Sequence, residues 1–384
     1  MRYRYSAGAD GKPVKKAAIY TRDEHGINLD DIDGEAVGVV QRLKDSGYES
    51  YIVGGAVRDL ILGKKPKDFD IASEASPAQI RRLFRNSRII GRRFKLVHVY
   101  FGPRIYEVST FRSLTDGING NTYGTIEEDV QRRDFTMNAL FYDPAQQVVI
   151  DYVGGMKDIR AKRVKAIFPI ATIFTDDPVR MIRAVKYSAA TGFSIPLLLK
   201  WKIKAQSHLL SSISSSRLTE EIFKIIRSPY AAGIAEALDD VGLYAYLQPG
   251  AAAQMKANSL FRNRYLQSLA ALNGEKFKNR PGEALGALVN DYLEDTADLT
   301  LGISESYKAA YSIARNFILP MTPPRFELEH AVRRFFSSRG MHVMKSLTLD
   351  RGGGKPKAEE GSAAAESKPR RRRPRRKPKG KTGQ

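Results

Sequence analysis

Residues 51–73 read YIVGGAVRDLILGKKPKDFDIAS and contain the clearest local pattern in the chain. The apolar residues 51–53 precede Gly54 and Gly55, which predicts a strand that runs into a glycine turn. A helix is predicted directly after the turn, over AVRDLILG, and a second strand over PKDFDIAS. Glycine at such a turn lets backbone N–H groups approach phosphate oxygens, and Arg58, one turn into the helix, is placed to reach the same phosphates.

Two carboxylates occupy alternate positions of the second predicted strand. Asp68 and Asp70 are two residues apart, so their side chains point to one face of a strand. A pair of this kind is often only a surface feature, but the glycine turn and Arg58 favour a catalytic interpretation. The two acids repel each other, and Mg²⁺ or Mn²⁺ would remove the repulsion. Since two such cations can activate an attacking oxygen and stabilise a leaving one, the pair predicts a metal-dependent active site.

A third acidic residue is expected near the pair, and the sequence offers two candidates. Glu107 lies on the predicted strand RIYEVSTF and could reach the metals from a neighbouring strand. Asp134 lies in a helix predicted over residues 127–141, where it either completes the acidic site or pairs with an adjacent arginine. Arg133 is in turn a candidate ligand for a triphosphate.

Three polar residues recur at intervals of three in the segment DDPVRMIRAV. Asp177, Arg180 and Arg183 fall on one side of a predicted helix, either as an ion-pair ladder or as a surface that reads a base. Adenine presents an amino donor beside a ring-nitrogen acceptor, which Asp177 and Arg180 can match. Cytosine presents the same order, whereas uracil and guanine reverse it. The pattern therefore selects A and C without deciding between them.

The chain is strongly basic, with 63 Lys and Arg against 42 Asp and Glu and a net charge of +21. This excess predicts a polyanionic partner. Residues 352–384 contain twelve basic and three acidic residues, a net +9, and almost no large apolar side chain. They are predicted to form a disordered tail that binds RNA or DNA phosphates, only aids solubility, or binds a membrane surface. Arg92, Arg93 and Lys95, near the predicted catalytic strands, either hold a primer or phosphates or form a basic strand–loop edge.

Composition excludes several classes of site. The absence of cysteine excludes disulfides, a cysteine nucleophile and thiolate metal sites, and five scattered histidines are too few for a dense histidine cluster. No apolar run approaches the roughly 18 residues of a membrane span, and the N-terminus lacks the apolar core of a secretory signal. A cytoplasmic protein with no membrane partner is expected.

Periodicity divides the chain into five parts of an α+β protein. Strand and helix patterns alternate over residues 31–155, which predicts a small mixed α/β head. Helical patterns over residues 156–250 and 251–350 predict an elongated all-α neck and body. Residues 1–30 and 351–384 are predicted to be unstructured.

The motifs GGAVRDLILG, DFD, RRDFTMNAL and DDPVRMIRA resemble, in order and spacing, those of the class II tRNA nucleotidyltransferase and bacterial poly(A) polymerase superfamily. The resemblance covers about residues 48–250 and implies a polymerase-β-like nucleotidyltransferase head, with a nucleotide-selecting helix and an RNA-binding region in the neck. It implies Mg²⁺ on Asp68 and Asp70, with Asp134, or less directly Glu107, completing the acidic site. The nucleotide-binding residues that it implies are Gly54, Gly55, Arg58, Arg133, Asp177, Arg180 and Arg183.

Two activities share this motif series, CCA addition to tRNA and poly(A) addition to RNA. The segment RIIGRRFKLVHVYFG is similar to the stretch that marks bacterial poly(A) polymerases, and the basic tail fits that activity better. We therefore expect a template-independent polynucleotide adenylyltransferase that joins AMP from ATP to RNA 3′ ends and releases pyrophosphate. The alternatives are a CCA-adding tRNA nucleotidyltransferase and an inactive RNA-binding protein of the same fold. RNA 3′ ends and ATP are the expected partners of a monomer.

Overall fold

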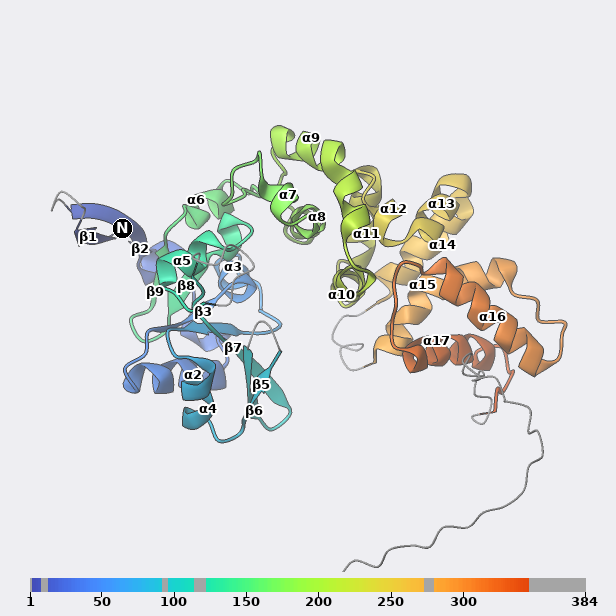
Figure 1. The fold of residues 1–384 in the computed structure, drawn as a ribbon, viewed down its shortest axis with the longest axis horizontal. Coiled ribbons are helices and arrows are strands. Elements are labelled where there is room, and N and C mark those ends of the chain that lie inside the picture. The colour runs from blue at the N-terminus through green and yellow to red at the C-terminus, as the bar shows by residue number, and fades with distance from the viewer. Residues whose placement is uncertain (1, 8–12, 92–95, 114–121, 273–279, 345–384) are drawn as a thin grey trace, which may run out of the picture. The chain divides into compact units, whose positions relative to one another are not determined.

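The computed structural model describes residues 2–7, 13–91, 96–113, 122–272 and 280–344. Along the chain a mixed β-sheet comes first, and every named element after β9 is a helix (Figure 1). The predicted mixed head and helical C-terminal part are confirmed. The predicted basic tail lies outside the described residues.

The head is built on one nine-stranded sheet, with the order β1-β2-β9-β8-β3-β4-β7-β6-β5. Strands β4 and β7 pair in parallel, and the other seven neighbouring pairs are antiparallel. The strands are β1 (Arg2–Ala7), β2 (Pro13–Tyr20), β3 (Ser50–Val53), β4 (Asp70–Ser73), β5 (Ser87–Ile90), β6 (Leu96–Phe101), β7 (Arg104–Thr110), β8 (Leu140–Asp143) and β9 (Val148–Asp151).

Helices pack on both faces of this sheet. In α2 (Gly34–Asp45) the buried residues recur with helical spacing, and α2 packs on β3 and β4. Next to it, α4 (Pro77–Leu83) begins with a capping box between Ser76 and Gln79 and packs on β5, β6 and β7 (Figure 1). The other helices of the head are α1 (Arg22–His25), α3 (Gly55–Ile61), α5 (Ile126–Gln131) and α6 (Gly155–Arg160).

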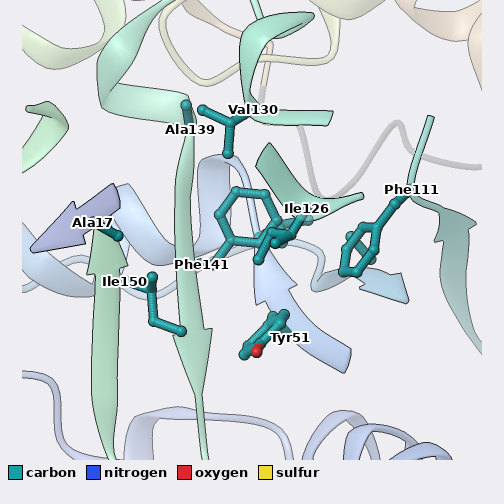
Figure 2. Packing of buried hydrophobic residues seen from close by; sticks show 10 residues of the cluster. Ala17, Tyr51, Phe111, Ile126, Val130, Ala139, Phe141 and Ile150 are labelled. Carbon is teal, nitrogen blue, oxygen red and sulfur yellow. The ribbon is translucent and has the colours of Figure 1, made fainter. Parts of the chain in front are cut away.

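The face opposite α2 carries a compact aromatic and aliphatic core under α5. The Phe141 ring of β8 lies beside Ile126 and Val130 of α5 (Figure 2). Tyr51 and Phe111 continue the cluster, with ring centroids of Tyr51 and Phe141 6.0 Å apart in an edge-to-face arrangement. This packing fixes the end of β3, from which the glycine turn leaves.

The sequence predicts that residues 1–30 are unstructured, but two strands form in this segment. β1 and β2 form an antiparallel hairpin, and β2 pairs with β9. Ala17 and Tyr20 of β2 are buried, so pairing with β9 offsets the entropy of ordering this polar segment. That partner lies some 130 residues along the chain, beyond the reach of local sequence pattern.

The helix predicted over residues 127–141 is shorter in the structure. α5 ends at Gln131, a 3₁₀ turn covers Thr136–Asn138, and β8 starts at Leu140. Phe135 and Thr136 are buried against the segment near residue 165, to which Thr136 N–H donates a hydrogen bond. This tertiary pairing interrupts the helix at the motif that contains Asp134.

Eleven further α-helices, joined by loops and one 3₁₀ turn, follow in the described chain. They are α7 (Ile173–Asp176), α8 (Val179–Thr191), α9 (Leu197–Gln206), α10 (Ser215–Ile226), α11 (Ala231–Asp240), α12 (Tyr244–Leu247), α13 (Pro249–Ala257), α14 (Ser259–Ala270), α15 (Pro281–Thr296), α16 (Ile303–Phe317) and α17 (Arg325–Ser337). Among the helices described, none combines the length and hydropathy that a membrane crossing requires.

Gly155 makes a close contact that predicts a stability effect. A Cβ at this position would overlap the carbonyl oxygen of Thr136 and lie 3.0 Å from Leu140 Cδ2. We expect Gly155→Ala to lower the free energy of unfolding by about 1–3 kcal/mol. The matched control is Gly38→Ala in α2, where a Cβ meets nothing within 4 Å and helix propensity should stabilise the fold by up to about 1 kcal/mol. Urea unfolding of both variants measures the difference; equal effects would contradict the packing described.

Candidate active site

The turn between β3 and α3 has a backbone conformation that favours glycine. Gly54 has φ +74° and ψ −136°, a combination that residues with a Cβ rarely adopt. A Cβ on Gly54 would lie 3.8 Å from Asp70 Oδ2 and 3.9 Å from Arg133 Nη1. The predicted glycine turn is confirmed, and it lies directly beside an acid and an arginine.

Asp70 begins β4 at the centre of the sheet. It is in register with Val53 of β3 on one side and with Glu107 of β7 on the other. The sequence predicts Asp68 on the same strand, but Asp68 lies in the segment before β4. On the β3 side the pairing ends at Val53, where the glycine turn leaves the sheet, so no β3 residue lies opposite Asp68. The two acids nonetheless remain close enough to interact electrostatically.

The electrostatic environment of Asp70 disfavours its ionised form. Asp70 keeps solvent access on its pocket side, but protein atoms crowd its carboxylate on the other sides. This partial desolvation, followed by the charges of Glu107 and Asp68, raises the pKa of Asp70 to about 6, and Arg133 opposes the rise. A cation at this position would stabilise the ionised carboxylate.

The acidic cluster suits a hard cation that takes some of its ligands from the protein and the others from a substrate. In the described residues, no group of three or more His, Cys, Asp and Glu side chains is arranged to hold a metal ion by itself. Mg²⁺ commonly takes only one or two carboxylates and completes its shell with water and substrate phosphates. Asp68 and Asp70 offer hard oxygen donors, and the raised pKa of Asp70 reflects negative charge that such a cation would neutralise. The donor set therefore fits Mg²⁺ or Mn²⁺ bound together with a nucleotide.

A cationic pocket of about 440 Å³ opens beside Asp70. Four guanidinium groups and two carboxylates contribute to its walls, so cationic side chains predominate there. Arginine binds phosphate oxygens through paired N–H donors, which suits the pocket to a polyphosphate. The residues that line it are Gly54, Gly55, Arg58, Asp70, Arg132, Arg133, Asp134, Asn138, Arg183 and Tyr187.

Two of these arginines are held in place by neighbouring side chains. Arg58 donates hydrogen bonds to Asp59 Oδ1 at 2.8 and 2.9 Å and to Asn138 Oδ1 at 2.7 Å. Arg133 pairs with Asp129 at 2.9 Å, and its guanidinium carbon lies 4.8 Å from the centroid of the Phe141 ring. Both groups are thus oriented before a ligand arrives, which lowers the entropic cost of binding phosphates.

Asp134 lines the pocket, but its carboxylate is already paired with two arginines. Its carboxylate oxygens lie 3.1 Å from Arg180 Nε and 2.7 Å from Arg183 Nη1. Arg180 is only 1% exposed, and it also donates to the Ile173 carbonyl at 3.2 Å. Of the two candidates for the third acid, the structure places Glu107 in register with Asp70 and places Asp134 in an ion-pair network.

The predicted base-reading residues are only partly in the pocket. Arg183 lines it, whereas Asp177 and Arg180 do not. Asp177 accepts hydrogen bonds from Arg217 at 2.8 and 2.9 Å and from the Val179 N–H at 3.2 Å, ahead of the first turn of α8. The three side chains therefore do not form one free surface in this structure.

Several residues that sequence reasoning misses support the site. Arg132, Asn138 and Tyr187 line the pocket, and Glu221 of α10 holds Arg183 at 3.4 Å and Lys186 at 2.8 Å. Burial alone would raise the pKa of Glu221, but Lys186, Lys224 and Arg183 lower it to about 2. Helical spacing to Arg183 is the one sequence signal that could have indicated Tyr187. The predicted RNA-binding residues Arg92, Arg93 and Lys95 lie outside the described residues.

Comparison with protein families assigns two segments of the chain. Residues 50–165 match the poly A polymerase head domain. Residues 192–255 match a family described as the probable RNA and SrmB-binding site of polymerase A. The first segment contains the glycine turn, the acidic cluster and the pocket arginines of the head.

Curated relatives include both activities of the superfamily. Over 250 residues the chain is 42% identical to poly(A) polymerase I of Escherichia coli O6:H1. This alignment covers 61% of this chain and 54% of that protein. Over 230 residues it is 37% identical to the CCA-adding enzyme of Geobacillus kaustophilus, covering 58% and 56%. The chain thus spans about half the length of the curated relatives that it matches.

Solved structures show the same fold. The CCA-adding enzyme of Bacillus stearothermophilus, determined with CTP, aligns with a TM-score of 0.55 at 29% identity and covers 79% of this chain and 82% of that one. Its likeness extends over the mixed head and the helices that follow. With the head-domain match and the relatives above, this alignment shows that the chain belongs to the tRNA nucleotidyltransferase and poly(A) polymerase superfamily.

Proposed function

We propose that the protein is a template-independent polynucleotide adenylyltransferase that adds AMP from ATP to RNA 3′ ends. The observation that supports this proposal most is the position of Asp70, beside Gly54, in register with Glu107 and at the edge of an arginine-lined pocket. The poly(A) polymerase I relatives are 38–45% identical to the chain, and the CCA-adding enzymes are 37–38% identical.

The proposed chemistry is an in-line displacement at the α-phosphate of ATP. Arg58, Arg133 and Arg183 bind the triphosphate and hold it beside Asp70. The RNA 3′ oxygen forms a bond to the α-phosphorus as the bond to pyrophosphate breaks, and the arginines stabilise the charge that develops on the phosphate oxygens. Asp68 and Asp70 would hold Mg²⁺ or Mn²⁺, as a pair of ions in the two-metal form of the reaction, which supplies Lewis-acid stabilisation of those oxygens.

Base selection is proposed for the start of α8. Asp177 would accept a hydrogen bond from the adenine amino group, and Arg180 would donate to the ring nitrogen. In this structure Asp177 accepts from Arg217, and the buried Arg180 donates to Asp134 and to the Ile173 carbonyl. An incoming base would therefore have to share or replace these contacts, and the Arg180 side chain would have to move to reach it. Arg183, which lines the pocket, would bridge the base site and the phosphate site.

RNA binding is proposed along α9, inside the segment that matches the RNA and SrmB family. Leu197 and Trp201 of this helix are 86% and 64% exposed. Lys200 and Lys204 flank them, and the helix contains no acidic residue. An exposed indole beside ammonium groups suits single-stranded RNA, because bases stack on aromatic rings and phosphates attract lysine.

Trp201→Ala is therefore expected to weaken RNA binding about tenfold, while Trp201→Phe keeps most of it. The Tm and the KM for ATP should stay unchanged, because the side chain is exposed and belongs to neither the core nor the pocket. Fluorescence anisotropy with a labelled oligoadenylate measures the affinity. The matched control is Leu260→Ala on α14, another exposed apolar side chain. If the Trp201→Ala variant and the control bind the RNA with equal affinity, α9 does not bind RNA.

Incorporation of single nucleotides tests the proposed function. The protein is incubated with Mg²⁺, one NTP at a time, and either a generic RNA primer or a tRNA that lacks its terminal CCA. We expect long additions with ATP on the generic primer and little incorporation of the other nucleotides. Incorporation of CTP that stops after two residues would establish the CCA-adding alternative, and no incorporation with Mg²⁺ or Mn²⁺ would leave an RNA-binding protein. We further propose that the enzyme acts in the cytoplasm as a monomer, in RNA polyadenylation.

A further inference from the structure

A row of polar side chains leads from Asp70 to the edge of the sheet. Asp70 is in register with Glu107 of β7, Glu107 with His98 of β6, and His98 with Arg88 of β5. Residues in register on neighbouring strands carry their side chains on the same face of a sheet. An acid, an imidazole and a guanidinium therefore follow Asp70 in one line.

The face that carries this row is open to solvent over β5, β6 and β7. Glu107 has a side chain 50% exposed, and Ile105, two residues before it, is 49% exposed. By contrast, Val97 and Val99 of β6 alternate with His98 and are buried on the face where α4 packs. The row therefore lies on a surface that a ligand can reach.

Contacts within the row orient its members. His98 Nε2 lies 3.3 Å from Glu107 Oε1. The Tyr100 ring, on the same face, meets the His98 ring edge-on with centroids 6.4 Å apart. Arg88 is exposed on the edge strand, in register with His98. Tyr100 thus provides a ring on which a base can stack, His98 a ring N–H donor, and Arg88 a guanidinium that can bind a phosphate.

The geometry of in-line transfer indicates what this surface binds. Gly54 follows β3, and Arg133 lies beside it with its guanidinium over Phe141 of β8, the strand next to β3. In the proposed reaction these two residues place the triphosphate and its leaving pyrophosphate on the β3 side of Asp70. An in-line displacement requires the attacking oxygen on the opposite side of the α-phosphate. That side is the β7 side, where Glu107 and His98 follow Asp70.

We infer that the open face of β5 and β6 binds the 3′-terminal nucleotide of the RNA. Tyr100 stacks on the terminal base, His98 donates to the ribose or the last phosphate, and Arg88 pairs with the preceding phosphate. This inference rests on the proposed function, because only a chain-extending enzyme needs the RNA end beside Asp70. It adds a substrate site distinct from the proposed RNA path on α9.

Steady-state kinetics on a trinucleotide primer tests the site, because so short an RNA reaches only the surface nearest to Asp70. We expect Tyr100→Ala and Arg88→Ala each to raise the KM for this primer about tenfold and to leave the KM for ATP and the Tm unchanged. Tyr100→Phe should restore the wild-type KM, since it keeps the ring. The matched control is Arg82→Ala, an exposed arginine on α4 at the other face of the sheet. A KM for the primer that is unchanged, or raised equally in the control, would overturn the inference.

Photocrosslinking separates this inference from the proposed function. RNA ending in 4-thiouridine should crosslink within residues 96–107, and Arg88→Ala should weaken the crosslink, whether or not the protein incorporates AMP. A wild-type protein that crosslinks there but incorporates no nucleotide would overturn the proposed function alone. Crosslinks confined to α9 would overturn the terminal-nucleotide site alone.

Discussion

Asp70→Asn is expected to abolish nucleotide incorporation while making the fold more stable. The substitution removes a carboxylate that would hold the cation beside the triphosphate, and loss of such charge stabilisation lowers the rate by about 10³-fold or more. Stability should change in the opposite direction, because Glu107, Asp68 and partial desolvation disfavour the ionised carboxylate. Residues placed for function commonly cost stability in this way.

The pH dependence of this stability gain has a definite sign. The pKa of Asp70 is about 6 in the folded protein and near 3.8 when unperturbed, so the folded state binds the proton more tightly. The fold therefore loses stability as the pH rises from about 4 to 6 and Asp70 ionises. Thermal unfolding in EDTA should show a rise in Tm for Asp70→Asn that is larger at pH 8 than at pH 5.

Asp240→Asn on α11 is the matched control, since Asp240 is exposed and far along the chain from the pocket residues. It should retain both activity and Tm. RNA affinity, measured by anisotropy, should be close to wild type in both variants. An Asp70→Asn protein that incorporates AMP at the wild-type rate would show that this carboxylate takes no part in the chemistry.

Asp134→Ala is expected to destabilise the fold severely, by about 3–5 kcal/mol. The carboxylate pairs with Arg180 and Arg183, and Arg180 is almost completely buried. Removing the acid leaves a buried guanidinium without its counter-charge. Urea unfolding measures the loss, and Asp134→Asn should lose less because the amide keeps one acceptor.

Glu107→Gln provides the comparison that separates the two candidate acids. Its side chain is half exposed and in register with Asp70, so we expect a large loss of activity with little change in the free energy of unfolding. The opposite pattern, a stable Asp134→Ala variant together with a fully active Glu107→Gln variant, would contradict the roles that the geometry favours.

Sequence patterns predict the part of this site whose residues lie close together in the chain. The glycine turn, Arg58 and Asp70 lie within seventeen residues, and each belongs to a strand, turn or helix with a recognisable pattern. The mixed head and the helical region after it follow from the same periodicities, and the family resemblance adds the order of the three motifs.

Partners that are distant in sequence account for what could not be predicted. Asp134 pairs with arginines 46 and 49 residues later, and Asp177 with an arginine 40 residues later. The sequence suggests only neighbouring arginines or a ligand as partners for each acid, because ion pairing between distant segments leaves no periodic signal. The β1–β2 hairpin is unexpected for the same reason, since β9 supplies the neighbouring strand.

Binding of Mn²⁺ in the presence of ATP tests most directly whether the acids beside the glycine turn hold a cation with a nucleotide. Electron paramagnetic resonance measures free and bound Mn²⁺ for the wild-type, Asp70→Asn and Asp240→Asn proteins. We expect wild type and Asp240→Asn to bind Mn²⁺–ATP alike, and Asp70→Asn to bind it at least about tenfold more weakly. Equal binding by all three proteins would contradict a cation site at Asp70.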